Sequence, residues 1–218
     1  MLVLGLPSYH HSGWGLVRDG KILRAIQEER LNRLKHYPFY VDIKDHPMIL
    51  GLEYLFRGTE YSVSDLDAVT IPVLPRDQEV SRSQEHWVST KNIEEALKAQ
   101  DYFNRSPSGY REDRDYASLL NLLKNEGFQG QVVWVNHHLS HAAYAYCTSG
   151  YRKADVLSYD GTGCGMPEEV IVGFRVDNHE YEVLFKEYIP NSMGHVYSHT
   201  TERIFGERSA GCEGKTMG

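Results

Sequence analysis

The chain has 218 residues, 41% hydrophobic and 24% charged, a composition that excludes disordered and fibrous proteins. Its 23 basic and 30 acidic residues give a formal net charge of -7, which disfavours nucleic acid as a partner because long-range attraction to phosphates is absent. No apolar run reaches the roughly 20 residues that cross a bilayer. Its three cysteines (Cys147, Cys164 and Cys212) lack a Cys-x-x-Cys spacing. We therefore expect a soluble cytoplasmic protein with reduced thiols and no membrane partner.

The first elements in chain order are predicted to be three short strands, over residues 2–6, 14–17 and 22–26. Asp19-Gly20 separates the second strand from the third. Because glycine accepts the positive φ of a tight turn, Asp-Gly between apolar runs indicates a hairpin.

A charged helix is predicted for residues 27–36 and another helix for residues 45–56, followed by a strand over residues 68–74. Residues 75–128 are less regular and more polar, and we expect them to be an insertion. Two short helices are predicted within this insertion, at residues 92–103 and 113–124.

The second half of the chain is predicted to contain both strands and helices. We expect strands at residues 131–135 and 154–160, a hairpin of residues 170–176 and 181–187, and helices at residues 137–147 and 194–205. This mixture predicts an α/β fold with a partly antiparallel sheet.

Three histidines open the helix predicted after residue 135. Since residues four apart lie one above the other on a helix, His137 and His141 can present two imidazoles to one ion. His138 with His141 is a competing pair that spacing alone does not exclude. The strand that ends in Asp160 could add a carboxylate. A ligand set of two imidazoles and one oxygen suits Fe(II) or Zn(II) and does not choose between them.

Glycines and basic residues elsewhere suggest a phosphate site. Gly161 and Gly163 follow the predicted strand, where backbone N–H groups can approach a phosphate closely. The loop between the first two strands holds His10, which could act as a base near neutral pH, and a turn that could bind phosphate. Lys35 could add positive charge. Residues 213–218 end in Gly-Lys-Thr-Met-Gly, but no glycine stands five residues before Gly214, where a phosphate-binding loop of the Walker type has its first glycine.

Taken together and in order, these motifs resemble the O-carbamoyltransferase family of nodulation-factor and antibiotic biosynthesis. The matching stretches are Leu4-Gly5-Leu6 with Tyr9-His10-His11-Ser12, residues 16–22, residues 27–36, Val135-Asn136-His137-His138-Leu139-Ser140-His141-Ala142-Ala143, Asp160-Gly161-Thr162-Gly163, Tyr197 with Thr200 and Thr201, and Glu213-Gly214-Lys215-Thr216-Met217-Gly218.

The resemblance implies an actin-like or sugar-kinase-like (ribonuclease-H-like) fold, a mixed sheet flanked by helices. Residues 1–218 would be its first subdomain, with the second subdomain missing, so the chain is expected to be a fragment or one subunit of a split enzyme. Family members use carbamoyl phosphate and ATP to form carbamoyl adenylate, whose carbamoyl group passes to a hydroxyl of a small acceptor. A C-terminal partner chain or a homodimer is therefore expected as well.

The resemblance also implies roles for single residues. It assigns acceptor or carbamoyl-site roles to His10 and Lys35, a metal site to His137, His141 and Asp160, and a nucleotide or phosphate site to Ser12, Gly161, Thr162, Gly163 and Lys215. The implied cofactor is a divalent metal, Fe(II) or Zn(II). ATP is an implied substrate, and Mg(II) is a candidate ion to bind with it. Two alternatives stay open, namely a threonylcarbamoyl-transferase-like tRNA modification factor and a non-catalytic subunit of a split enzyme.

Overall fold

A computed structural model describes residues 1–6, 12–34, 50–72, 87–104, 115–161, 163, 168–206 and 214–217. The chain divides into two compact units. Unit 1 comprises Met1–Asp77 and Trp87–Val135, and unit 2 comprises Gln78–His86 and Asn136–Gly218.

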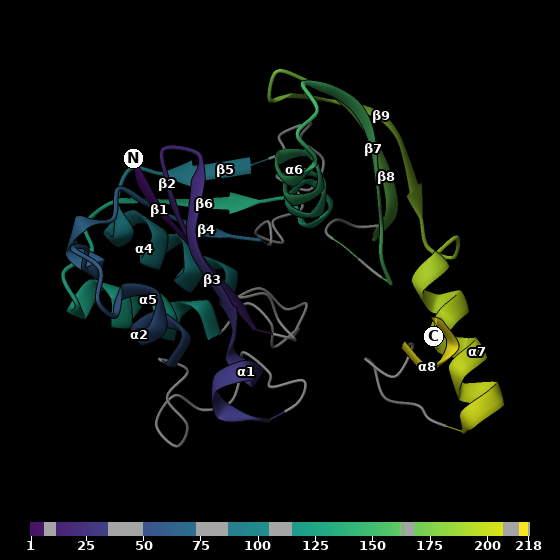
Figure 1. Cartoon of the computed structure of the whole chain (residues 1–218), viewed down its shortest axis with the longest axis horizontal. Helices are drawn as coiled ribbons and strands as arrows, with labels where there is room; N and C mark the ends of the chain where they lie inside the picture. The colour runs from purple at the N-terminus through teal and green to yellow at the C-terminus, as the bar shows by residue number, and fades with distance from the viewer. Residues whose placement is uncertain are drawn as a thin grey trace. The chain divides into compact units, whose positions relative to one another are not determined.

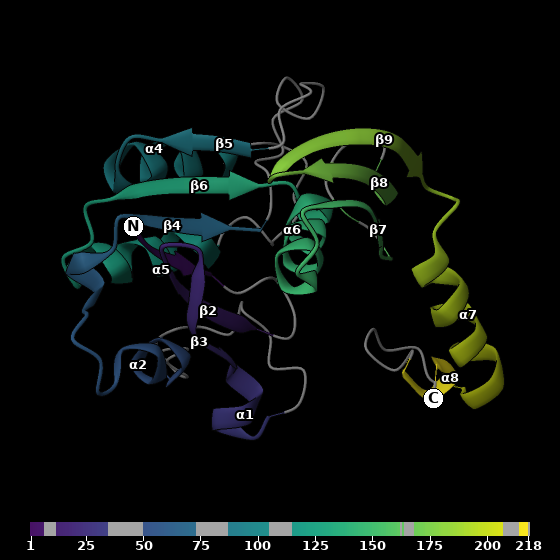
Figure 2. The same ribbon diagram turned by 45° about the horizontal axis from the view of Figure 1, so that its top comes forward.

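A six-stranded mixed sheet forms the centre of unit 1 (Figure 2). Its strand order is β3-β2-β1-β4-β6-β5. The strands are β1 (Leu2–Gly5), β2 (Gly13–Arg18), β3 (Lys21–Gln27), β4 (Ala68–Ile71), β5 (Trp87–Thr90) and β6 (Gln131–Val135). β1 pairs in parallel with β4, as β4 does with β6, whereas β2 and β3 join the edge beyond β1 in antiparallel pairs. β5 closes the other edge, antiparallel to β6.

The predicted hairpin between β2 and β3 is confirmed. Arg18 pairs with Lys21, which leaves Asp19 and Gly20 as a two-residue turn. Both turn residues have positive φ, 48° and 77°. This is the primed geometry whose twist matches that of the flanking strands.

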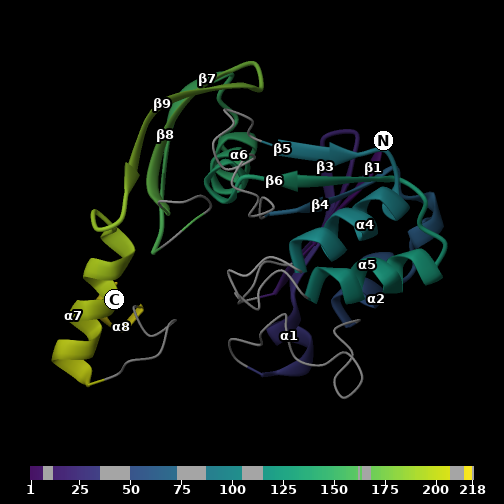
Figure 3. The same cartoon turned by 180° about the vertical axis from the view of Figure 1, so that it is seen from behind.

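Helices cover the sheet of unit 1. They are α1 (Glu28–Asn32), α2 (Leu50–Phe56), the 3-10 turn η1 (Val63–Asp65), α4 (Ile93–Asn104) and α5 (Asp115–Asn125). α2 packs on β2 and β3, while α4 packs on α5 and against β5 and β6 (Figures 1 and 3). The core includes fully buried side chains from strands and helices alike: Leu4, Leu16, Leu55, Ile71, Ile93, Leu119, Leu120, Leu123 and Phe128.

Unit 2 is built on a three-stranded antiparallel sheet of order β7-β8-β9. Its strands are β7 (Lys153–Tyr159), β8 (Glu169–Asp177) and β9 (Glu180–Tyr188), and its helices are α6 (His137–Ser149), α7 (Met193–Phe205) and α8 (Gly214–Met217). α6 packs on β7 and β8, α7 contacts β8, and α8 lies beside α7 (Figure 1). Val172, Phe174 and Val176 of β8 are buried at alternate positions, which places one sheet face against α6.

The mixed α/β class and the mixed sheet flanked by helices are confirmed by this arrangement. β5 is a strand that the sequence did not predict, and it lies within the expected insertion at residues 75–128. The assignment to an actin-like fold, the insertion and the reading of residues 1–218 as a first subdomain stay predictions. No helix in the described ranges is long and apolar enough to span a membrane.

Candidate metal centre

α6 and β7 bring three potential metal ligands together in unit 2. α6 begins at His137, directly after Asn136, whose side-chain oxygen accepts a hydrogen bond from the backbone N–H of Leu139 (3.1 Å) and so caps the helix. Asp160 follows the last residue of β7, and its backbone N–H donates to the carbonyl of Val170 (3.0 Å). The sheet therefore holds the carboxylate while the capped first turn of α6 holds the imidazoles.

The ligand atoms of the three side chains face one another. Nε2 of His137 lies 2.9 Å from Oδ2 of Asp160 and 3.2 Å from Nε2 of His141. The third separation, from Nε2 of His141 to Oδ2 of Asp160, is 3.4 Å. A tetrahedral ion with bonds of about 2.1 Å holds its ligand atoms about 3.4 Å apart. The triangle is thus close to the size that one Zn(II)-sized or Fe(II)-sized ion requires.

The His137–His141–Asp160 cluster is partly open to solvent. The His137 side chain is 22% exposed, that of Asp160 43% and that of His141 56%. Three protein ligands with an accessible side correspond to a catalytic metal site, in which a further position is left for water or substrate.

Hydrogen bonds stabilise Asp160 as a carboxylate. Burial by itself would raise its pKa, but the bonds from His137 and His141 and from the backbone N–H of Gly161 (2.6 Å to Oδ1) outweigh burial and hold the pKa far below its usual value. An ionised carboxylate beside two imidazole nitrogens is a suitable donor set for a divalent cation.

His138 is excluded from the cluster, which resolves the choice between the two histidine pairs. It is fully buried, and its Nδ1 lies 2.8 Å from Oγ of Ser158 while Nε2 lies 3.1 Å from the carbonyl oxygen of Glu169. A carbonyl only accepts, so Nε2 carries the hydrogen and Nδ1 accepts from the Ser158 hydroxyl. Burial lowers the pKa of His138, in agreement with a neutral ring. His138 therefore ties α6 to β7 and β8 and leaves His137 and His141 as the pair that faces Asp160.

A second buried network orients the start of α6. The side-chain amide of Asn136 donates to Oε2 of Glu169 (3.0 Å), and Oε1 of Glu169 accepts from the ammonium of Lys186. Because the other side of the Asn136 amide caps α6, this network links the helix terminus to β8 and β9. The network therefore holds the first turn of α6, which begins at His137.

Two glycines allow the loop after β7 to pack tightly. A Cβ at position 163 would lie 2.6 Å from Nε2 of His138, and one at position 194 would lie 2.5 Å from the backbone N of Gly161. Ser192, the N-cap of α7, has its hydroxyl 2.9 Å from the carbonyl oxygen of Asp160 and 2.8 Å from that of Gly161. The first turn of α7 thus packs directly on Asp160 and Gly161.

The other predicted site residues are not ligands in the His137–His141–Asp160 cluster. His10, Lys35 and Thr162 lie outside the described residues. Ser12 is buried in unit 1, where its carbonyl oxygen accepts from the backbone N–H of Glu28 (2.8 Å). Lys215 lies on α8, which packs on α7. The phosphate-site roles of Ser12, Gly161, Gly163 and Lys215 stay predictions.

Sequence patterns alone did not single out four residues that position α6 and the loop after β7, namely Ser158, Glu169, Ser192 and Gly194. Ser158 was detectable in principle, since it is a polar residue at an inward-facing position of an alternating strand. Glu169 gave no comparable signal, because its side-chain and carbonyl partners come from two other elements, α6 with its N-cap and β9.

Comparison with known proteins identifies the family. The model of the "Carbamoyltransferase N-terminus" family matches residues 2–218, nearly the whole chain. The chain belongs to this carbamoyltransferase N-terminus family. The resemblance inferred from the sequence motifs is therefore confirmed.

Two relatives of known sequence are similar to this family member. The nodulation protein NolNO of Sinorhizobium fredii is 28% identical over 166 residues, which is 73% of this chain and 21% of NolNO. The uncharacterized protein sll1178 of Synechocystis is 26% identical over 205 residues, 90% of this chain and 31% of that protein. The chain thus spans between a fifth and a third of the length of these relatives.

Proposed function

We propose that this chain provides the divalent cation site of an ATP-dependent carbamoyltransferase. In this reaction, carbamoyl phosphate and ATP yield carbamoyl adenylate, and its carbamoyl group passes to a hydroxyl of a small acceptor. The proposal is carried by the convergence of His137, His141 and Asp160 in a chain of the carbamoyltransferase N-terminus family.

The residues present fit a bound cation. His137, His141 and Asp160 would hold Fe(II) or Zn(II), which supplies Lewis-acid polarisation of a carbonyl or phosphoryl oxygen. Asp160 contributes a stable negative charge. His138, Ser158 and Glu169 hold α6 at the correct distance from β7, so the imidazoles need no rearrangement when substrate arrives.

Proton removal from the acceptor hydroxyl is the other requirement of the transfer. We assign it to His10, which the family resemblance places at the acceptor or carbamoyl site, and general-base assistance of this type typically contributes about 10²- to 10⁴-fold in rate. Lys35 would lie at the carbamoyl or acceptor site, and Mg(II) would accompany ATP.

The cation site can be tested by metal analysis of the purified chain. We expect about one equivalent of Fe or Zn in the wild type and its loss in the double variant His137→Ala/His141→Ala, because two of the three ligands are removed. The matched control is His179→Ala, which removes a histidine from the β8–β9 turn. Equal metal content in the wild type and the double variant would contradict the cation site.

Transfer can be tested by mass spectrometry of a panel of hydroxyl acceptors incubated with the protein, carbamoyl phosphate and ATP. A carbamoylated product that requires both co-substrates is expected from the complete enzyme. Salt-sensitive binding of tRNA in its place would favour the threonylcarbamoyl alternative.

A further inference from the structure

A group of potential hydrogen-bond donors lies on α7, outside the His137–His141–Asp160 cluster. His195, His199 and Arg203 follow one another at intervals of four residues, so they share one face of the helix. Arg203 is exposed and makes no ion pair with an acid in the described part of the chain. We refer to His195, His199 and Arg203 as the α7 basic face.

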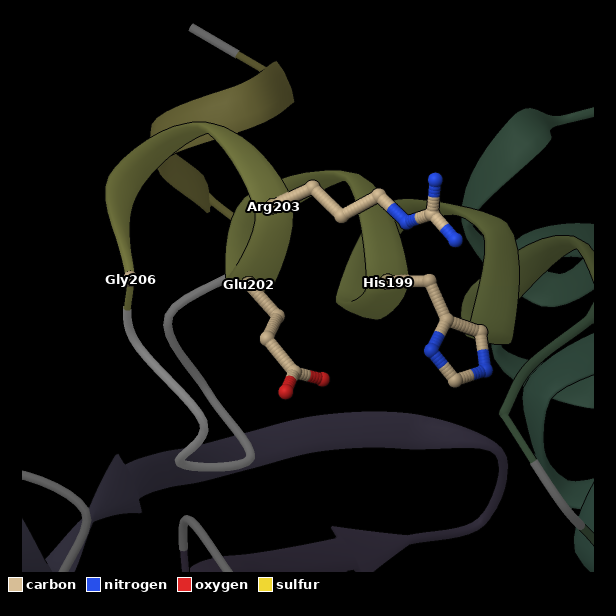
Figure 4. Close-up of a pocket in the computed structure, with 4 residues that line it drawn as sticks. All are labelled: His199, Glu202, Arg203 and Gly206. Carbon is tan, nitrogen blue, oxygen red and sulfur yellow. The ribbon is translucent and has the colours of Figure 1, made fainter.

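Part of this face lines a pocket. His199, Glu202, Arg203 and Gly206 line a space of about 450 Å³. Figure 4 shows the His199 ring and the Glu202 carboxylate projecting from the same side of α7, while the Arg203 side chain extends along the helix toward the turn that carries His199. The volume is within the roughly 300–1,000 Å³ of sites that bind small molecules.

The other end of the basic face lies beside the loop that follows Asp160. A Cβ on Gly161 would lie 3.9 Å from Cδ2 and 4.0 Å from Nε2 of His195. α7 rises about 12 Å between His195 and Arg203. The three side chains therefore extend from the residue next to a proposed metal ligand to the pocket at the C-terminal end of the helix.

The chemistry of the pocket indicates an anionic ligand. The Arg203 guanidinium only donates hydrogen bonds and matches two oxygens of a phosphoryl group, and His199 can donate a further one. The Glu202 carboxylate carries negative charge, so it disfavours a second anionic group nearby.

We propose that the α7 basic face binds a phosphoryl group of a substrate, held by Arg203 and His199. The proposal rests on the proposed function, since both ATP and carbamoyl phosphate carry phosphoryl groups and react near the cluster. His195 would then contact the part of the substrate between the pocket and the Asp160–Gly161 loop. Neither Arg203 nor His199 belongs to the motifs that indicated the family.

Calorimetric titration of the metal-chelated chain tests this site, because chelation removes binding of anions to the cation itself. The probes are inorganic phosphate, AMP and carbamoyl phosphate. We expect Arg203→Gln/His199→Asn to weaken binding about 10-fold or more, since hydrogen bonds to charged groups contribute on that order. The control Arg152→Gln removes an exposed arginine beside β7 and should leave affinity unchanged.

The order of affinities identifies the source of the phosphoryl group. Tighter binding of AMP indicates a nucleotide, and tighter binding of carbamoyl phosphate indicates the carbamoyl donor. Equal affinities of the wild type and the double variant, or no binding of any probe by folded wild type, would overturn the proposal.

Metal content of each preparation, measured before chelation, separates this proposal from the proposed function. A wild type that holds metal but binds no probe contradicts the α7 site and leaves the cation site standing. A wild type that binds the probes through Arg203 but holds no metal contradicts the cation site alone.

Discussion

At the scale of single residues, buried polar side chains join separate helices and strands by hydrogen bonds in both units. In unit 1 the carboxylate of Glu28 is 1% exposed, and its Oε2 accepts from the indole N–H of Trp14 (3.0 Å) and from the backbone N–H of Gly51 (2.9 Å). Glu28 therefore joins α1 to β2 and to the start of α2. Burial raises the pKa of Glu28 and outweighs these two hydrogen bonds, which lower it.

This shift has a defined sign for stability. Because the folded pKa of Glu28 is raised, the protonated side chain adds to the free energy of unfolding. This stabilisation is fully present below the unfolded pKa near 4.5 and is lost as pH rises through the folded pKa. We expect Glu28→Gln, which keeps an acceptor without a buried charge, to match or exceed the wild type in free energy of unfolding at pH 7. Its advantage should disappear below about pH 4.5, as urea unfolding at several pH values would show.

The control for this prediction is Glu28→Ala. It leaves the Trp14 indole and the Gly51 N–H without their acceptor, so we expect a loss of about 1–3 kcal/mol for each unsatisfied buried donor. A Glu28→Gln protein as unstable at pH 7 as the alanine variant would show that the charge itself is required.

At the scale of elements, α6, β7 and α7 together determine where Asp160 lies. α6 is attached through His138 to Ser158 and Glu169, and the first turn of α7 packs on Gly161 through Gly194. The loop after β7 is thus held on two sides. Its position follows from packing among three elements and from none of them alone.

A methyl group at position 194 should displace this loop. We expect Gly194→Ala to lower metal affinity at least about 10-fold, because its Cβ would lie 2.5 Å from the backbone N of Gly161, next to Asp160. The control Gly214→Ala meets no atom within 4 Å on α8 and should bind metal normally. Competition with a chromogenic chelator measures both affinities, and equal values for the two variants would contradict the role of this contact.

At the scale of the whole molecule, all three proposed ligands lie in unit 2, and none comes from unit 1. Metal binding to the folded state stabilises the part of the protein that forms the site. Unit 2 also exposes apolar side chains of α7, with Met193 45%, Val196 56% and Ile204 66% exposed. The homodimer or partner chain that the family resemblance implies stays a prediction.

Hydrogen exchange should reveal this division of the chain. On addition of Zn(II), we expect slower exchange in α6 and in the β7–β8 sheet, and no change in β1, β4 or α5 of unit 1, because only unit 2 contains the ligands. The variant His137→Ala/His141→Ala should show no metal-dependent protection anywhere. Protection of equal size in both units of the wild type would contradict a cation site confined to unit 2.

Local patterns in the sequence determined most elements of this protein. The Asp19-Gly20 turn, the apolar alternation of β7 and β8 and the helical spacing of α6 and α7 depend on neighbours within a few residues. β5 was missed because it has only four residues and lies in a polar region, and its pairing with β6 links residues far apart in the chain.

Only the tertiary structure decided which histidines of α6 face Asp160. Helical spacing allowed His141 to act with either His137 or His138, and both choices satisfy the same periodicity. Contacts with Ser158 and Glu169, 20 and 31 residues away, use both nitrogens of His138 and turn its ring into the interior. A hydrogen bond between distant residues depends on how strands and helices pack, which a local pattern does not contain.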